Sequence, residues 1–291
     1  MRFISPLRYP GGKGRLAPYI STLMSWQDPL PEIYAEPFAG GAGVALKLLV
    51  DGDVDRIHIN DLNPGIAAFW RAVFDAPEEF ADMIDSEDVS LDAWHRWRDV
   101  YLNPEGVDDL SLGFATFFLN RTNRSGILTA RPIGGLDQAG TWKIDARFNR
   151  PNLSGRVRFL GDFAARVTVT ELDARVMIRS LGAEASQYFV YVDPPYLVQG
   201  DQLYMSGLSA DDHQGVADAL AETDARWLLT YDADARVTAT LYSTHRCLEF
   251  DIRHNAHRNH LGQEYAVFAP NLVVPDDTVV VSGLGRWIRA S

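Results

Sequence analysis

The sequence predicts an α/β fold built on a parallel sheet, with a mainly helical segment inserted into the sheet-forming part of the chain. Short apolar segments typical of buried strands occur near the start of the chain and again in its last third. A glycine-rich turn follows the first of these strands and opens a helix, the usual link between parallel strands. From about residue 64 to 113 the apolar residues recur with helical spacing instead.

The chain begins with a loop that contains Pro10, Gly11 and Gly12, followed by a helical pattern over residues 15–26. Lys13 lies in this loop, just before the helix, where it suits an anionic group at the helix N-terminus. An ordinary turn explains the same residues equally well. The loop is not a Walker A motif, because the residues required before Gly-Lys-[Ser/Thr] are missing.

The next unit predicts a site for a nucleotide-type ligand. Residues 32–36 and 56–60 have strand composition, and Gly40 and Gly43 lie in the turn that follows the first strand. In such folds small residues let the backbone approach the ligand, and an acid about 20 residues later holds the ribose hydroxyls. Asp61 has that spacing from Gly40. Because Gly-x-Gly-x-x-Gly is absent, S-adenosylmethionine, which has no pyrophosphate, fits better than a dinucleotide.

The middle of the chain is expected to be helical first and irregular later. The aromatic residues around Trp94 and Trp97 have helical spacing, so we expect them to pack into a core rather than to stack on a ligand. After a buried-looking apolar run at residues 112–119, a loop-rich stretch extends to about residue 155. Residues 158–163 have the pattern of a short strand that ends at an acid, Asp162, and residues 176–181 are expected to be helical.

The stretch with the clearest chemistry is Asp193-Pro194-Pro195-Tyr196, which follows a predicted buried strand at residues 189–192. In open α/β sheets, ligands bind at the carboxyl ends of strands. An exocyclic amine on an aromatic ring is a poor nucleophile because its lone pair is delocalised into the ring. Asp193 and the Pro194 carbonyl offer two acceptors for its N–H groups, Pro195 fixes the turn, and Tyr196 can stack on the ring. The alternative is a strand followed by a Pro-Pro turn.

The rest of the chain completes the predicted sheet. Ser209 and Asp212 form a capping pattern for a helix that extends to about residue 222, and residues 227–231 are expected to form a strand. Residues 247–252 and 265–269 are predicted to form late strands that pair antiparallel. Between them His254, His257 and His260 have a spacing that suits a metal. Since no cysteine accompanies them and the loop is rich in Asn and Arg, we expect a loop that faces nucleic acid and no metal.

Charge is distributed unevenly. The net charge of −12 argues against a general polyanion binder. Residues 121–158, however, contain eight basic and two acidic residues, which suits contact with nucleic acid along one surface. Arginine reads guanine or binds phosphate, and asparagine pairs with adenine. The candidate DNA-binding residues are Asn120, Arg121, Asn123, Arg124, Arg131, Lys143, Arg147 and Arg150.

The composition and the first residues of the chain bear on the cellular compartment of the protein. A chain of 291 residues with 46% hydrophobic content is long enough for a large core, and its single cysteine, Cys247, excludes a disulfide framework. The first residues do not resemble a signal peptide, and no apolar stretch is long enough to span a membrane. We therefore expect a cytoplasmic protein with no membrane association.

Taken together, these motifs resemble the Dam-like (D12 class) family of DNA adenine-N6 methyltransferases. The resemblance covers most of the chain and rests on five stretches in order: residues 8–13, residues 36–43, Asn60-Asp61-Leu62-Asn63, residues 119–126 and Asp193-Pro194-Pro195-Tyr196. It implies a Rossmann-like, S-adenosylmethionine-dependent methyltransferase sheet formed by residues 1–64 and 156–291. It also implies a mainly helical target-recognition insert over residues 65–155 that binds double-stranded DNA.

The resemblance also implies roles for individual residues. Asp193, Pro194, Pro195 and Tyr196 would hold the target adenine, and Asp61 would bind the ribose hydroxyls. The residues expected around the cofactor are Tyr9, Lys13, Phe38, Gly40, Gly43, Asp61, Asp162, Phe163 and Asp193. GATC specificity is not implied, because residues 127–130 carry no arginine where the GATC-reading members have one.

Other functions remain open on the residues alone. One is methylation of cytosine N4 or of an RNA base, which uses the same kind of site. Another is a DNA-binding subunit without catalysis in a restriction or defence assembly, although the intact Asp193 motif and Lys13 argue against it. A nicotinamide-dependent oxidoreductase is disfavoured by the glycine pattern. Restriction or defence components are candidate partners in any case.

Overall fold

The computed structural model describes residues 4–8, 13–197, 208–254, 260–275, 280 and 285–289. The chain forms two compact units. The sheet unit contains Gly11–Asn60 and Leu172–Ser291, and the helical unit contains Met1–Pro10 and Asp61–Glu171. The predicted insert of residues 65–155 falls within the helical unit, which extends beyond it at both ends.

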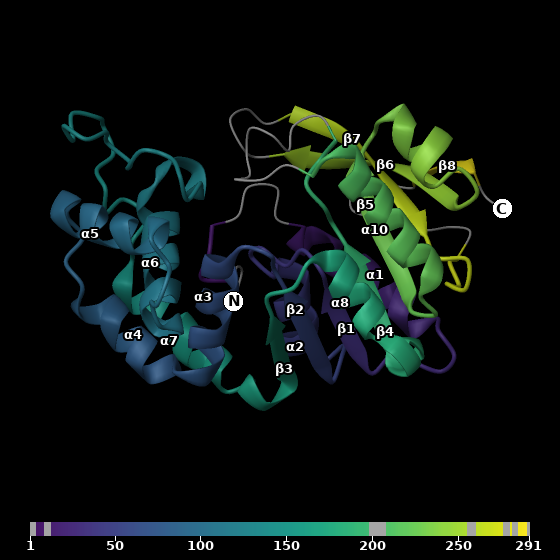
Figure 1. The fold of residues 1–291 in the computed structure, drawn as a ribbon, viewed down its shortest axis with the longest axis horizontal. Helices are drawn as coiled ribbons and strands as arrows, with labels where there is room; N and C mark the ends of the chain where they lie inside the picture. The colour runs from purple at the N-terminus through teal and green to yellow at the C-terminus, as the bar shows by residue number, and fades with distance from the viewer. Residues whose placement is uncertain are drawn as a thin grey trace. The chain divides into compact units, whose positions relative to one another are not determined.

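The sheet unit is organised around four parallel strands: β1 (Ile33–Glu36), β2 (Arg56–Asn60), β4 (Tyr188–Val192) and β5 (Arg226–Asp232). Three further strands extend the sheet antiparallel beyond β5: β6 (Arg246–His254), β7 (His260–Phe268) and β8 (Arg286–Arg289). The strand order within this unit is β2-β1-β4-β5-β7-β6-β8 (Figure 1). The predicted strands at the start and end of the chain are thus confirmed, including the late antiparallel pair.

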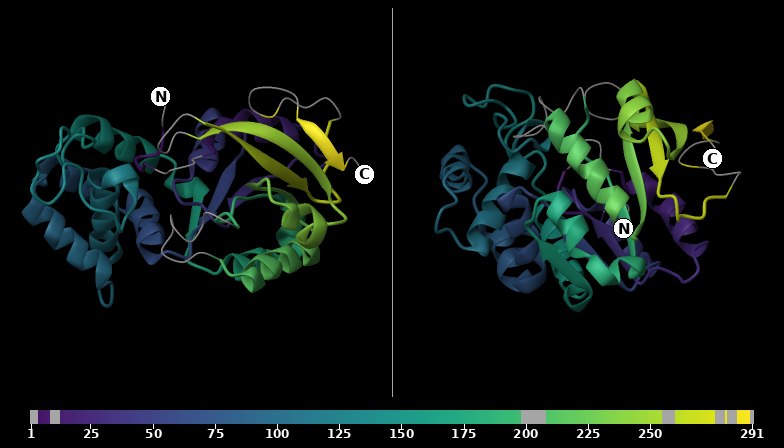
Figure 2. Two further views of the ribbon diagram at one scale, coloured as in Figure 1. Left: turned by 90° about the horizontal axis from the view of Figure 1, so that it is seen from above. Right: turned by 45° about the vertical axis from the view of Figure 1, so that its right-hand side comes forward.

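Helices cover both faces of this sheet. On one side, α1 (Ala17–Ser25) packs on α2 (Gly43–Asp51). On the other, α8 (Ala174–Ser180) packs on α10 (Ala210–Glu222), and Figure 2 shows these two helices together beneath the strands. Ser209 and Asp212 form the predicted capping box of α10. Strand β1 is buried throughout, and β2, β4 and β5 are buried except at end residues, as expected for a parallel sheet covered on both faces.

The helical unit contains α3 (Pro64–Asp75), α4 (Pro77–Ser86), α5 (Leu91–Leu102), α6 (Asp109–Thr122) and α7 (Arg150–Gly161), together with the short strand β3 (Val167–Thr170). Its core is a cluster of phenylalanines, among them Phe69, Phe80, Phe114 and Phe117, with neighbouring ring centroids about 6 Å apart. The α6 helix is buried along most of its length because it packs against α3 and α5. The apolar run at residues 112–119 forms the centre of this helix.

One predicted element is wrong. Residues 158–163 do not form a strand, because α7 extends to Gly161. The side chain of Asn149 caps this helix and Pro151 lies in its first turn, so the residues expected to be a loop begin a helix instead. The strand of this region is β3, and the acid that follows it is Glu171.

Among the described residues, no helix is long and apolar enough to cross a membrane.

Candidate active site

The carboxyl ends of β1, β4 and β5 meet at one edge of the sheet unit, since these strands are parallel neighbours. Asp193 follows β4 directly, and Thr230 lies near the end of β5. The Thr230 hydroxyl donates a hydrogen bond of 2.8 Å to Oδ1 of Asp193 and pairs at 2.8 Å with the hydroxyl of Tyr191. This arrangement fixes the orientation of the Asp193 carboxylate.

Lys13 places a positive charge against the same oxygen. Its Nζ lies 3.2 Å from Oδ1 of Asp193. The Lys13 side chain is buried, and its Nζ also donates to the hydroxyl of Tyr196 at 2.9 Å. Every contact of the Asp193 carboxylate within the described part of the chain is to Oδ1. Oδ2 is therefore the oxygen left to accept a hydrogen bond from a substrate.

Glu264, which the sequence analysis missed, completes this cluster from β7. Its carboxylate is fully buried, and both of its oxygens accept a hydrogen bond of 2.9 Å from Lys13 Nζ. The Tyr196 hydroxyl donates to Oε1 of Glu264. The available signal was an acid directly before the apolar run Tyr265-Ala266-Val267-Phe268, because an acid next to a buried strand segment is rarely buried unless it is paired.

Burial and neighbouring charges shift the protonation equilibria in this cluster. Burial raises the pKa of Asp193; the positive charge of Lys13 counteracts this rise, and the negative charge of Glu264 adds to it. Burial alone would lower the pKa of Lys13, but Asp193 and Glu264 together raise it well above its ordinary value. Lys13 therefore remains protonated, and one lysine is shared by two carboxylates.

The glycine-rich turn after β1 leads into α2. Gly40 has φ = 46° and Ala42 has φ = 47°, so the backbone is left-handed at both positions. The N-cap residue of α2, Ala42, makes no side-chain capping hydrogen bond. In the first turn the Ala45 N–H bonds Glu36, and the preceding N–H groups, which no intrahelical carbonyl can satisfy, favour a negatively charged ligand group. Phe38 and Gly43, two of the predicted cofactor residues, are half-buried in this turn.

Glu36, the last residue of β1, stabilises this turn through hydrogen bonds of its side chain. Its Oε1 accepts a hydrogen bond of 2.9 Å from the backbone N–H of Ala45 in α2 and another from the hydroxyl of Tyr34. Burial raises the pKa of Glu36 to about 8, in spite of these two hydrogen bonds. Glu36 is thus a neutral acid at pH 7 that ties strand β1 to helix α2.

Three predicted cofactor residues lie in the helical unit, and a fourth, Tyr9, lies outside the described residues. Asp61 follows β2, its backbone N–H bonds the Thr170 carbonyl, and its Oδ1 accepts from the Asn63 N–H. Asp162 is exposed at the end of α7, and the ring of Phe163 packs on that of Phe159 with the centroids 5.4 Å apart. The family resemblance implied that Asp162 and Phe163 lie near the cofactor, and this assignment stays a prediction.

The candidate DNA-binding residues fall into two groups. Asn120 and Asn123 are buried, at 1% and 0% exposure, and their side-chain amides bond main-chain carbonyls. Asn120 also accepts a hydrogen bond of 2.7 Å from the Arg8 N–H, so it fixes the start of the chain against α6. Both asparagines have structural contacts that occupy their amides. The exposed candidates are Arg124, Arg131, Lys143 and Arg147, whereas Arg121 and Arg150 are half-buried.

Four arginines of the helical unit gather without acidic partners among the described residues: Arg8, Arg121, Arg147 and Arg156. Within the described part of the chain their side-chain hydrogen bonds go to main-chain carbonyls, for example from Arg121 to Arg147 and from Arg156 to Ser5. Burial, followed by the like charges of the other three, lowers the pKa of Arg121 to about 9. We call this group the arginine cluster. Uncompensated positive charge of this kind favours an anionic ligand.

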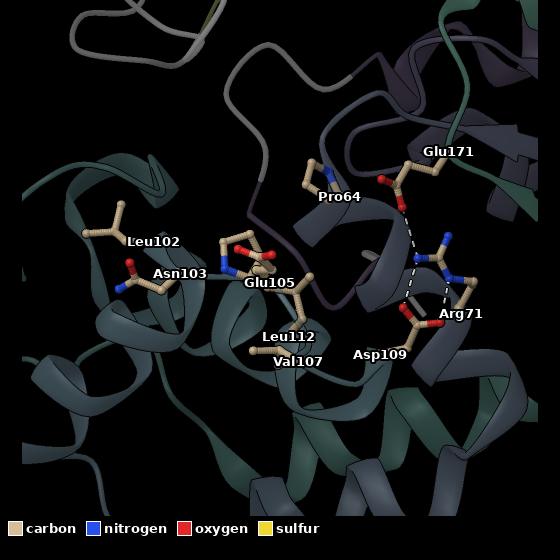
Figure 3. A pocket seen from close by; sticks show the side chains of 10 residues that line it. Pro64, Arg71, Leu102, Asn103, Glu105, Val107, Asp109, Leu112 and Glu171 are labelled. Carbon is tan, nitrogen blue, oxygen red and sulfur yellow. Dashed lines mark hydrogen bonds and ion pairs between the residues drawn. The ribbon is translucent and has the colours of Figure 1, made fainter.

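A separate cavity of about 550 Å³ lies in the helical unit between α3, α5 and α6 (Figure 3). Arg71 bridges Asp109 and Glu171 at its edge with hydrogen bonds of 2.7–3.0 Å. None of the predicted site residues lines this cavity. Elsewhere in the described part of the chain, no group of three or more His, Cys, Asp or Glu residues is arranged to hold a metal ion.

Comparison with known proteins gives one family match. The model of the D12 class N6 adenine-specific DNA methyltransferase family matches residues 9–258. No curated protein matches the chain. Among solved structures, the rRNA methyltransferase aviRa from Streptomyces viridochromogenes is similar with a TM-score of 0.38 and 14% sequence identity. That match covers 91% of this chain and 88% of the other.

Proposed function

The chain belongs to the family of D12 class N6 adenine-specific DNA methyltransferases, and on this premise we propose that it methylates adenine in DNA with S-adenosylmethionine as donor and Asp193 as the acceptor for the amine. The family match confirms the resemblance found in the sequence and the assignment as an enzyme. The observation that carries the residue assignment is the Asp193 carboxylate, which is held at Oδ1 by Thr230 and Lys13.

Asp193 prepares the amine for attack. With Oδ1 held, Oδ2 accepts one N–H of adenine N6, and the Pro194 carbonyl accepts the other. Two such hydrogen bonds draw the amine towards tetrahedral geometry and localise its lone pair. As positive charge develops on N6, the nearby carboxylate stabilises it and then takes the released proton.

S-Adenosylmethionine, when bound, supplies an electrophilic methyl group on a positively charged sulfur, and the C–S electron pair stays on sulfur as the N–C bond forms. The chain's residues suit this donor. The N–H groups at the N-terminus of α2 that precede Ala45 favour the donor's carboxylate. Small residues at Gly40 and Gly43 allow close approach of the backbone, and Asp61 holds the ribose hydroxyls.

The helical unit is proposed to bind DNA. Its arginine cluster and the exposed Arg124, Arg131 and Lys143 supply positive charge on a chain whose net charge is −12. Double-stranded DNA keeps adenine N6 inside the helix, so the base must be flipped out, at a cost of a few kcal/mol. Stacking on Tyr196 offsets part of this cost.

A DNA-modifying enzyme with one buried free cysteine fits the reduced cytoplasm.

Expression in a bacterial host that lacks adenine methylation tests this proposal. Single-molecule sequencing of the host genome is expected to find N6-methyladenine within one defined motif, and an Asp193→Ala variant is expected to leave the genome unmodified. Purified protein with labelled S-adenosylmethionine and methylation-free DNA provides the matching test in vitro. Transfer of the labelled methyl group to cytosine, or to RNA and not to DNA, would contradict the proposal.

A further inference from the structure

Glu264 is the residue on which the buried contacts of the active-site cluster converge. It lies on β7, in the antiparallel part of the sheet, and not at the tip of a parallel strand. Its carboxylate accepts from Lys13 through both oxygens and from the Tyr196 hydroxyl through one of them. A buried carboxylate is unfavourable unless its partners compensate for lost hydration. Lys13 and Tyr196 provide that compensation here.

We propose that Glu264 is a positioning residue for methyl transfer, which holds Lys13 and Tyr196 in place and thereby keeps Asp193 available to the adenine amine. This inference rests on the proposed function, because Asp193 is the amine acceptor only if that function holds. Glu264 itself touches neither adenine nor donor in this scheme. It acts through its two partners.

The first part of the argument concerns Lys13. Its Nζ has three protons, and the shortest contacts, at 2.9 Å, go to Glu264 and Tyr196, whereas Asp193 lies at 3.2 Å. Glu264 thus draws Lys13 away from Asp193. Without the charge of Glu264, Lys13 would bind Asp193 more tightly, and the carboxylate would become a weaker acceptor for the amine.

The second part concerns Tyr196. Its ring follows the Pro194-Pro195 turn, and its hydroxyl is anchored at both Glu264 and Lys13. Lys13 Nζ also lies 5.1 Å from the centre of the ring. An anchored ring loses less conformational freedom when a flipped base stacks on it. Glu264 therefore links the base-stacking residue to the amine-binding residue through one carboxylate.

Several other groups influence Asp193 electrostatically, and they set the background for a pH test. They are Tyr34 and Glu36 on β1, Tyr191 on β4 and Tyr231 on β5, in addition to Lys13 and Glu264. Glu36 has a pKa of about 8 and is therefore mainly neutral at pH 7 and below. Lys13 and the tyrosines, whose pKa values are raised, do not change charge there either. The substitution Glu264→Gln removes one negative charge next to Lys13.

Glu264→Gln tests the inference, since it removes the charge and keeps the shape. Under single-turnover conditions at neutral pH, methyl transfer should slow by about tenfold or more. S-Adenosylmethionine and DNA should bind with affinities close to those of wild type. The acidic limb of the pH–rate profile should move down by about one pH unit, because Asp193 loses a neighbouring negative charge. A purely structural role would not move this limb.

Two further variants sharpen the test. Glu264→Asp keeps the charge but shortens the side chain, so the rate should fall while the acidic limb stays near its wild-type position. Glu249→Gln is the matched control, because Glu249 lies on the neighbouring strand β6 and pairs with Arg286 on β8. The hydrogen bonds of the Glu249 side chain in the described part of the chain go to Arg286 and not to the cluster. The rate and pH profile of this variant should therefore equal those of wild type.

The outcomes are distinguishable. If the wild-type enzyme makes no N6-methyladenine, the proposed function itself fails. If wild type is active and Glu264→Gln has an unchanged rate and acidic limb, the inference about Glu264 is overturned. If thermal melts show that Glu264→Gln does not fold, the Tyr196→Phe variant tests the inference instead. Loss of the hydroxyl should slow methyl transfer by about fivefold with donor affinity retained, and an unchanged rate would again overturn the inference.

Discussion

Thr230 on β5 donates a hydrogen bond of 2.8 Å to Oδ1 of Asp193, at the end of the neighbouring strand β4. The contact joins two strands whose positions are fixed by the parallel sheet, so the carboxylate is oriented before any substrate binds. Preorganisation of this kind lowers the cost of reaching the transition state.

Asp193→Ala should abolish methyl transfer, because the amine loses the acceptor that activates it. We expect a decrease of at least about 10²-fold in the single-turnover rate. Isothermal titration calorimetry should show S-adenosylmethionine binding within a few-fold of wild type, since α2 and its glycine-rich turn are untouched. Near-normal turnover in this variant would exclude Asp193 from the chemistry.

Thr230→Val should shift the pH dependence in the direction opposite to Glu264→Gln. The Thr230 hydrogen bond lowers the pKa of Asp193, so its loss raises that pKa further. In the proposed mechanism Asp193 acts as the ionised acceptor, and this form is lost as the pH falls. The acidic limb of the pH–rate profile should therefore move to higher pH in the valine variant. A limb that stays in place would show that Asp193 is not the titrating group.

Arg121→Ala should weaken DNA binding, because it removes one charge from the arginine cluster. We expect a loss of about tenfold at low salt and a decrease of about one in the slope of log affinity against log salt. Fluorescence anisotropy with duplex DNA measures both. Arg158→Ala is the control, because Arg158 pairs with Glu78, Asp82 and Asp85. Equal losses in the two variants would contradict a specific role for the cluster.

Much of the active site was predictable because it is local in sequence. The Asp-Pro-Pro-Tyr motif and its preceding strand are contiguous, and so are the glycine-rich turn and α2. The family resemblance was equally available from five contiguous stretches. These features depend on short-range patterns of apolar, glycine and proline residues.

The remaining features depend on the tertiary fold. Lys13 and Glu264 are 251 positions apart, and only the pairing of β7 with β5 brings Glu264 to the cluster. Asparagine is a residue type that reads bases in DNA, but at Asn120 the start of the chain packs against α6 and buries the side-chain amide. The strand expected at residues 158–163 is wrong because Asn149 and Pro151 initiate α7, whose apolar residues face the core at helical spacing.

Asn120→Ala should destabilise the protein without changing its sequence preference. The amide bonds the Arg8 backbone and the Gly126 carbonyl, and the substitution leaves these buried groups without partners. We expect a loss of about 2–3 kcal/mol in the free energy of unfolding. Denaturant unfolding measures this loss, and methylome sequencing at permissive temperature measures the preference. A changed recognition motif in a fully stable variant would restore Asn120 as a DNA contact.

Glu36 makes the stability of the protein depend on pH. Its pKa is about 8 in the folded protein, whereas the ordinary pKa of a glutamate carboxyl, which applies to the unfolded chain, is 4.5. Between these values the unfolded state has lost the proton and the folded state keeps it, so stability falls as the pH rises. The decrease from pH 5 to pH 8 should be on the order of 3 kcal/mol.

Glu36→Gln removes this dependence and leaves the acceptor oxygen for the Ala45 N–H and the Tyr34 hydroxyl. Denaturant unfolding without cofactor should therefore show the glutamine variant gaining stability over wild type steadily from pH 5 to pH 8. Above the folded pKa the difference should level off, since both states of the wild-type protein are then ionised. A difference that does not vary with pH would mean that Glu36 is already ionised in the folded protein.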